Sequence, residues 1–263
     1  MDKIENFFHF IAPKIISLTN ERFENTKEIK YKDKDVDINF ATEGDWDNEK
    51  LIIEEISKWF SKDTIISEET LFDGRISNSQ NTWIIEPICG SSNFKNGIRF
   101  FCTNIAVAKN GELIAACVVD HSRGDYIWSI GEKKIYINHT LFNAKKDHKG
   151  IMIETDLSGL IGASKETLLK HERLISYLLH KKNYYLSSFC TSLPFACTAL
   201  GRIDAYANGF SKLWDQAAAN FLVLQAGGVI SETNGNPWTL SSDNVLATLD
   251  KNLHEELLKI MES

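Results

Sequence analysis

The stretch Trp83-Ile84-Ile85-Glu86-Pro87-Ile88-Cys89-Gly90-Ser91-Ser92-Asn93-Phe94 decides the fold. An apolar run leads to one carboxylate, Glu86, directly before Pro87. Because proline biases the preceding residue toward an extended conformation, Glu86 is predicted to end a strand. Residues 90–93 then supply hydroxyls and backbone amides of the kind that open a helix and attract phosphate. A carboxylate beside such amides suggests metal-assisted phosphoryl chemistry, although the same pattern also describes an ordinary strand, turn and capped helix.

Length and composition bound the class of protein. The chain has 263 residues, of which 43% are hydrophobic and 25% charged, enough for one large domain or two small ones with a sizeable core. Acidic residues number 36 against 29 basic residues, so the net charge is -7. Broad nucleic-acid binding is therefore not expected, because it depends on concentrated Lys and Arg.

The cysteines and the N-terminus point to a reducing compartment. Five scattered cysteines without C-x-x-C spacing favour free thiols over a disulfide framework. The first residues lack the basic and apolar regions of a signal peptide, and no apolar run approaches the ~20 residues that span a bilayer. We expect a cytoplasmic protein without a membrane segment.

Hydrophobic spacing predicts a mixed α/β or α+β layered fold. Residues 4–23 have helical spacing that Pro13 should kink or break, and the charged segment 24–37 should be an exposed loop or hairpin. A helix is predicted at 45–60 and a strand at 64–70. The other predicted elements are strands at 81–85, 101–109, 112–120, 125–130, 151–155, 184–187, 205–207 and 229–232 and helices at 165–179, 192–200, 213–225 and 252–261.

The chain divides near a polar segment at 145–149. We expect an N-terminal α+β half, residues 1–145, that carries the metal and phosphate motifs. A C-terminal α/β half, residues 146–263, should complete one compact catalytic unit.

Carboxylates adjoin the ends of four predicted elements: Asp45, Glu68 (or Glu69), Glu86 and Asp215. Taken singly, Asp45 and Asp215 are explained as helix caps, and Glu68 as solvated surface. Together they form a set of hard oxygen ligands that would suit Mg²⁺.

In combination these motifs resemble the three signatures of the inositol monophosphatase family. The first is Glu68-Glu69, the second is the stretch 83–94, and the third runs from Leu213-Trp214-Asp215 to Ala226-Gly227-Gly228. The resemblance covers nearly the whole chain. It implies a layered αβαβα sandwich of the inositol monophosphatase and fructose-1,6-bisphosphatase type. It further implies Mg²⁺-dependent hydrolysis of a small phosphomonoester, such as a phosphorylated polyol or sugar, usually by a homodimer.

The resemblance also assigns roles to individual residues. Asp45 would pair with the Ser91 hydroxyl to orient the attacking water, with Glu68 serving both catalysis and metal binding. The metal ligands that it implies are Glu68, Glu86, the carbonyl of Ile88, the position of Cys89, and Asp215. The phosphate and substrate positions that it implies are Gly90, Ser91, Ser92, Thr191 and Asn208.

Two departures fall on metal-binding positions. Glu86 stands where the family has a bridging aspartate, which displaces the carboxylate by roughly 1–1.5 Å. Cys89 replaces a second aspartate, and a neutral thiol is a poor ligand for a hard cation. In addition, the region before Trp214 reads Ala207-Asn208-Gly209, where inositol-binding members have a carboxylate.

Three hypotheses follow from these departures. The chain is a Mg²⁺ phosphatase with a weakened second metal site, or a catalytically impaired homologue that binds a phosphorylated metabolite or a protein. In the third hypothesis Cys89 recruits a softer metal, such as Mn²⁺ or Zn²⁺. Other chemistries lack their motifs, since neither a G-x-S-x-G elbow nor a Walker loop is present. Among the histidines only His121, at a predicted strand end, invites inspection.

Overall fold

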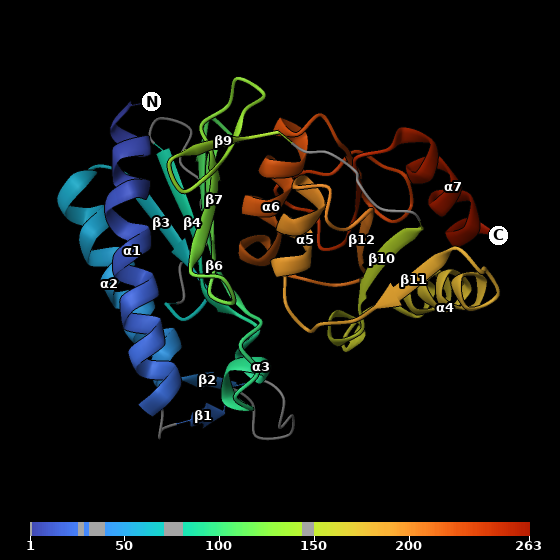
Figure 1. The fold of residues 1–263 in the computed structure, drawn as a ribbon, viewed down its shortest axis with the longest axis horizontal. Coiled ribbons are helices and arrows are strands. Elements are labelled where there is room, and N and C mark those ends of the chain that lie inside the picture. The colour runs from blue at the N-terminus through green and yellow to red at the C-terminus, as the bar shows by residue number, and fades with distance from the viewer. Residues whose placement is uncertain (1, 26–28, 32–39, 71–80, 144–149) are drawn as a thin grey trace.

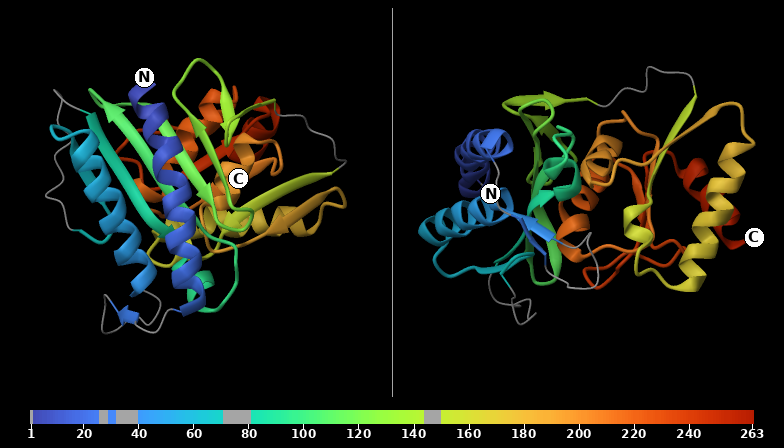
Figure 2. Two further views of the ribbon diagram at one scale, coloured as in Figure 1. Left: turned by 60° about the vertical axis from the view of Figure 1, so that its left-hand side comes forward. Right: turned by 90° about the horizontal axis from the view of Figure 1, so that it is seen from below.

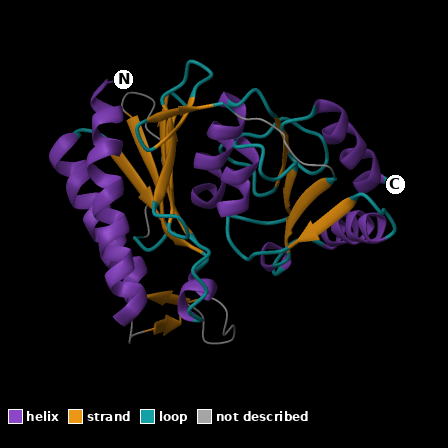
Figure 3. Ribbon diagram, viewed as in Figure 1, coloured by secondary structure: helices purple, strands orange, loops and turns teal. Residues whose placement is uncertain are grey.

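The computed structural model describes residues 2–25, 29–31, 40–70, 81–143 and 150–263. Helices and sheets alternate in layers, as Figures 1 and 3 show. The order is a helix pair, a seven-stranded sheet, a second helix pair, a five-stranded sheet and a third helix pair. This arrangement confirms the predicted αβαβα sandwich. No helix within the described ranges is long and apolar enough to cross a membrane.

The first two layers pack through an aromatic core. Helices α1 (Asp2–Asn25) and α2 (Glu43–Trp59) cover one face of the seven-stranded sheet. Phe7 and Phe8 of α1 lie edge-on to the buried indole of Trp83. In spatial order the strands are β3 (Thr64–Ser67), β4 (Asn81–Cys89), β5 (Cys102–Lys109), β6 (Glu112–Asp120), β7 (Asp125–Ser129), β8 (Ile135–Ile137) and β9 (Thr140–Phe142).

The middle helices α5 (Leu193–Ala199) and α6 (Leu213–Gln225) lie between the two sheets. The fully buried run Ala217–Ala219 lets α6 approach the sheets closely, since alanine adds little bulk. Figure 2 shows the same layering from below. The five-stranded sheet has the order β11 (Tyr184–Ser187), β10 (Ile151–Asp156), β12 (Ala205–Asn208), β14 (Val245–Thr248) and β13 (Val229–Ser231), and α4 (Lys165–Leu179) and α7 (Lys251–Glu262) cover its outer face.

Smaller elements complete the chain. Strand β1 (Ile29–Tyr31) pairs antiparallel with β2 (Phe40–Thr42), and α3 (Ser91–Lys95) follows the end of β4. A 3-10 turn, Ser158–Leu160, follows β10. The part of the predicted exposed segment at 24–37 that falls in β1 is a strand, whereas residues 26–28 and 32–37 lie outside the described ranges.

Three boundary predictions are wrong. Pro13 does not divide the first helix, because α1 continues through it from Asp2 to Asn25. The neighbouring side chains of Ile11, Ala12 and Ile15 are buried, and this packing offsets the lost backbone hydrogen bond. The strand at 81–85 does not end at Glu86, since β4 passes through Pro87 and ends at Cys89. In addition, β3 stops at Ser67, before the predicted end at residue 70.

Four element ends meet at one edge of the seven-stranded sheet. Strands β3 and β4 are parallel, with Ser67 opposite Ile85, so Glu68 and Glu86 follow at the same edge. The first turns of α2 and α6 also lie at this edge, because Asp45 contacts Ser91 and Asp215 contacts Cys89. This junction is where the sequence places the site.

Candidate active site

A register shift in β4 shapes the junction. Glu86 lies opposite Asn104 of β5 and Cys89 lies opposite Cys102, so β4 carries one extra residue between these pairs. The carbonyl of Pro87 accepts a hydrogen bond from Thr103 Oγ1 at 2.7 Å and a longer one from Asn48 Nδ2 at 3.4 Å. The bulge explains how proline is tolerated inside a central strand.

Asp45 is fixed on both of its carboxylate oxygens. It is the third residue of α2, where Oδ2 accepts hydrogen bonds from Thr42 N at 2.7 Å and Thr42 Oγ1 at 2.6 Å. Its Oδ1 accepts the Ser91 hydroxyl at 2.9 Å. Burial raises the pKa of Asp45 to about 6, although the three hydrogen bonds lower it. The structure therefore contains the predicted hydrogen bond between Ser91 and Asp45, and the pKa of Asp45 lies near neutral pH.

The other carboxylates form an acidic cluster around Glu86. Its side chain is 2% exposed, and Oε2 has no hydrogen-bond partner among the described residues. Burial, followed by the charges of Glu68 and Asp215, raises the pKa of Glu86 well above its usual value. Burial and then the charge of Glu68 raise the pKa of Asp215 to about 7. This mutual repulsion shows that the structure brings the predicted carboxylates together.

Cys89 is engaged within the protein. Its Sγ lies 3.9 Å from Asp215 Oδ1 and accepts a hydrogen bond from Ser192 N at 3.1 Å. A hydrogen bond with Cys102, and then burial, raise the pKa of the Cys89 thiol well above its usual value. At neutral pH the group beside Asp215 is thus an uncharged thiol.

The predicted phosphate loop, residues 90–93, depends on a glycine. Gly90 has φ 104°, in the left-handed region, and an added Cβ would come within 3.0 Å of Thr191 Cβ. Thr191 holds the loop by donating from Oγ1 to the carbonyl of Cys89 at 2.7 Å. Among the residues that the structure describes, no side chain caps the following helix, α3, which leaves the amides of Ser91 and Ser92 as candidate donors to a ligand.

Asn208 lies at the end of β12, and its amide serves the local structure. It donates to Tyr206 Oη at 3.1 Å and accepts from Phe210 N at 2.9 Å. Among the described residues, no hydrogen bond joins this side chain to the phosphate loop. Its substrate-binding role therefore stays a prediction.

Sequence reasoning missed Asn104 and Cys102 as supporting residues. Asn104 Nδ2 donates to Ser192 Oγ at 2.8 Å and, at 3.4 Å, to the carbonyl of Asp215. The signal was an amide inside a predicted strand, because a buried amide needs partners. His121 also has a structural role, since its Nε2 meets Thr103 Oγ1 at 3.0 Å and burial lowers its pKa to about 3.

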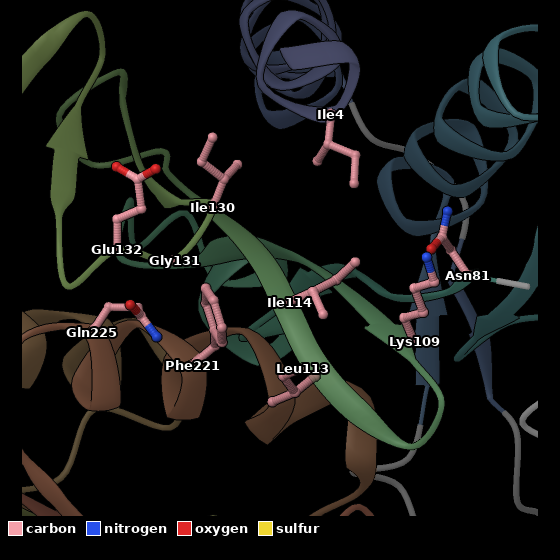
Figure 4. A pocket seen from close by; sticks show the side chains of 10 residues that line it. All are labelled: Ile4, Asn81, Lys109, Leu113, Ile114, Ile130, Gly131, Glu132, Phe221 and Gln225. Carbon is pink, nitrogen blue, oxygen red and sulfur yellow. The ribbon is translucent and has the colours of Figure 1, made fainter. Parts of the chain in front are cut away.

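A cavity of about 540 Å³ lies away from this site. It includes Asn81, at the start of β4, whereas the site lies at the end of that strand. Figure 4 shows the apolar side chains of Ile114 and Ile130 between Lys109 and Glu132. The cavity therefore contains none of the predicted catalytic or metal-binding residues.

The donor set suits one hard cation better than two. Glu68, Glu86 with its orphaned oxygen, and the carbonyl of Ile88 offer the oxygen ligands that Mg²⁺ prefers. The neutral, hydrogen-bonded thiol of Cys89 does not suit Mg²⁺. Within the described ranges, no three His, Cys, Asp or Glu side chains are already arranged to hold a metal ion.

Solved structures share this fold. The Thermotoga maritima IMPase superposes with a TM-score of 0.84 at 21% identity, over 100% of this chain and 97% of that one. An IMPase/NADP phosphatase complexed with Mg²⁺ and phosphate gives a TM-score of 0.81 at 16% identity, over 98% and 95% of the two chains. The chain thus shares the layered fold of these proteins.

Sequence comparison identifies the family. The chain is 30% identical to the Nus factor SuhB of Xylella fastidiosa over 207 residues, 75% of this chain and 70% of that protein. It is 28% identical to inositol monophosphatase 1 of Bos taurus over 256 residues, 92% and 88% of the two chains. The profile of the inositol monophosphatase family matches residues 1–263. The chain belongs to the inositol monophosphatase family.

Proposed function

We propose that the protein hydrolyses a small phosphomonoester, a phosphorylated polyol or sugar, by attack of an oriented water. The observation that carries the proposal is the hydrogen bond of 2.9 Å between Ser91 Oγ and Asp45 Oδ1, beside the open amides of the phosphate loop. Family membership and the names of relatives such as inositol monophosphatase 1 support a phosphoric monoester hydrolase.

The protein's own groups account for water activation. When the Ser91 hydroxyl donates its hydrogen bond to Asp45, the lone pairs of Oγ can accept a proton from an attacking water. Asp45, with a pKa of about 6, is mostly ionised at neutral pH yet basic enough to draw that proton away. The amides of Ser91 and Ser92 hold the phosphate oxygens while Gly90 keeps the loop clear of side-chain atoms.

Glu68, Glu86 and the carbonyl of Ile88 would hold a Mg²⁺ ion here. When bound, the ion supplies positive charge that offsets the acidic cluster and the phosphate. The solved Mg²⁺ and phosphate complex of an IMPase/NADP phosphatase supports this choice of ion. Asp215 would contribute to a second ion only weakly, because the Cys89 thiol lies beside it.

Phosphate release tests the proposal. The purified protein is incubated with a panel of inositol, sugar and nucleotide monophosphates, with Mg²⁺ or with Mn²⁺. We expect turnover of at least one phosphorylated polyol or sugar with Mg²⁺, and activity with Mn²⁺ or Zn²⁺ alone would instead favour a softer metal. A folded protein that releases no phosphate with any metal would sink the enzymatic proposal.

A second candidate function is a catalytically impaired homologue that retains phosphate binding. The contact of the Cys89 thiol with Asp215 favours it, since a neutral group occupies a position that the family fills with a carboxylate. In that case inorganic phosphate binds in calorimetry although no substrate turns over. A protein-binding role is equally compatible with a chain that does not turn over substrate. One relative carries the name Nus factor SuhB.

The exposed edge of the second sheet supports a homodimer. Strand β11 lies at this edge, with Tyr185 61% exposed and Leu186 36% exposed. Phe189 and Leu157 extend the apolar surface nearby in the chain. We expect a dimer by light scattering coupled to size-exclusion chromatography, and Tyr185→Glu should shift it toward monomer.

A further inference from the structure

Two cysteines face each other across the junction of β4 and β5. Cys89 and Cys102 are directly opposed partners in this antiparallel pair. Opposed residues in an antiparallel pair have Cα atoms about 4.5–5.5 Å apart, within the span that a disulfide bridges. The register therefore places two cysteines, thirteen residues apart in the chain, at a Cα separation that a disulfide can span.

Both sulfurs also contact the same residue, Ser192. Cys89 Sγ accepts from Ser192 N at 3.1 Å, and Cys102 Sγ lies 3.5 Å from Ser192 Oγ. Cys102 is fully buried, whereas Cys89 is partly exposed in the phosphate loop. Cys89 is therefore the member of the pair that a dissolved oxidant would meet first.

We propose that Cys89 and Cys102 form a reversible intrachain disulfide when a peroxide enters the site. The Cys89 thiol loses its proton to solvent in a small fraction of molecules, and the resulting thiolate attacks the peroxide. The O–O bond breaks, and a sulfenic acid forms with release of hydroxide or alkoxide. The sulfur of Cys102 then attacks the sulfenic sulfur, the S–O bond breaks, and water leaves. In sum, the two thiols lose two protons and two electrons, and the peroxide is reduced.

The disulfide would rearrange the site's sulfur contacts. Cys89 Sγ now accepts from Ser192 N at 3.1 Å and lies 3.9 Å from Asp215, while Cys102 Sγ lies 3.5 Å from Ser192 Oγ. Drawing the two sulfurs together removes these contacts and pulls on the Cys89 carbonyl that anchors Thr191. Oxidation should therefore weaken phosphate binding, a consequence that rests on the proposed function, whereas the disulfide itself does not.

The chemical step is tested on the whole wild-type protein. It is treated with hydrogen peroxide, alkylated after unfolding, digested and analysed by mass spectrometry. We expect a cross-linked peptide pair joining Cys89 to Cys102, two hydrogen atoms lighter than the sum of its parts, that disappears with dithiothreitol. The raised pKa of Cys89 makes its oxidation slower than that of an exposed cysteine. Cys89 oxidised to sulfinic acid without a cross-link, or cross-linked instead to Cys190, overturns the proposal.

Matched variants define the pair. Cys197→Ser, in α5, should keep the cross-link, and Cys102→Ser should lose it. If Cys102→Ser fails to fold, the wild-type peptide map still decides the question. Binding of inorganic phosphate with Mg²⁺ is then compared before and after oxidation, and we expect a loss of roughly tenfold, restored by dithiothreitol, as when orienting groups are disturbed. A cross-linked protein whose reduced form never binds phosphate refutes the proposed function and leaves the disulfide standing.

Discussion

Asp45 and Asp215 occupy the same position in their helices but have different neighbours. Each is the third residue of its helix, α2 or α6, and each returns a carboxylate oxygen to the backbone amide that precedes the helix, Thr42 N at 2.7 Å or Lys212 N at 2.8 Å. The other oxygen of Asp45 meets the Ser91 hydroxyl at 2.9 Å. The other oxygen of Asp215 meets the Cys89 thiol at 3.9 Å.

The comparison separates the frame of the site from its chemistry. Helix starts place both aspartates by the same capping geometry, which depends on backbone amides rather than on the partner side chain. What differs is the group across the phosphate loop, a hydroxyl at Ser91 and a thiol at Cys89. In the proposed function the hydroxyl side, Asp45 with Ser91, supplies the proton path. The thiol side, Asp215 with Cys89, lacks the charged oxygen ligand that the family resemblance implies there.

The largest expected effect on kcat comes from disrupting the hydrogen bond between Asp45 and Ser91. Asp45→Asn keeps the shape of the side chain and removes the charge that accepts the proton from Ser91. We expect kcat to fall roughly a hundredfold or more, the scale of a lost general base. Steady-state phosphate release measures this loss, and circular dichroism verifies the fold.

A neighbouring aspartate provides the control. Asp47 lies in the same helix and pairs with Arg22 outside the site, so Asp47→Asn should leave kcat within about twofold. If both variants lose activity equally, the Asp45–Ser91 pair has no special role.

The second prediction repairs the thiol side. Cys89→Asp places a carboxylate oxygen ligand next to Asp215. Glu86→Asp shortens the side chain at position 86 by one methylene. We expect the double variant to bind Mg²⁺ roughly tenfold more tightly and to turn over faster, because a hard cation prefers carboxylate oxygen. Calorimetric Mg²⁺ titration and phosphate release measure the two effects. Unchanged Mg²⁺ affinity would show that the thiol side is not the defect.

The third prediction concerns the pH dependence of the hydroxyl side. Burial raises the pKa of Asp45 to about 6, and the Thr42 side chain is the largest of the groups that lower it. Because Asp45 must be ionised to accept a proton, activity should rise with pH through that pKa. Thr42→Val removes the hydroxyl at 2.6 Å, so the acidic limb of the kcat profile should move to higher pH. Thr42→Ser keeps the hydroxyl and should leave the limb in place; equal shifts in the two variants would contradict the assignment.

The layered architecture was predictable from the sequence because periodicity and turn residues carry it. The Asn110-Gly111 turn between β5 and β6, and helix α6 from Leu213 to Gln225, are found where the pattern predicts them. Pro13 and Pro87 were misleading, because local preference yields to packing around α1 and to a bulge in β4.

The residues of the site were predictable by type, and their partners were not. The family resemblance predicted that Asp45, Ser91, Cys89 and Asp215 belong to one site. It did not show that Cys102 lies opposite Cys89, because that pairing depends on the one-residue register shift after Glu86. Such long-range contacts require the tertiary structure.

The smallest expected effect on catalysis concerns the support that both sides share. Thr103 Oγ1 donates to the carbonyl of Pro87 at 2.7 Å and lies 3.0 Å from His121 Nε2, beneath the bulge. Thr103→Val leaves these buried groups poorly satisfied and should lower the free energy of unfolding by about 1–3 kcal/mol in urea titration. Thr103→Ser retains the hydroxyl and should recover most of that loss. If the Pro87 carbonyl positions both the hydroxyl side and the thiol side, kcat and Mg²⁺ affinity should decline together in Thr103→Val, by no more than a few-fold. A decline in only one of them would show that the two sides are positioned independently.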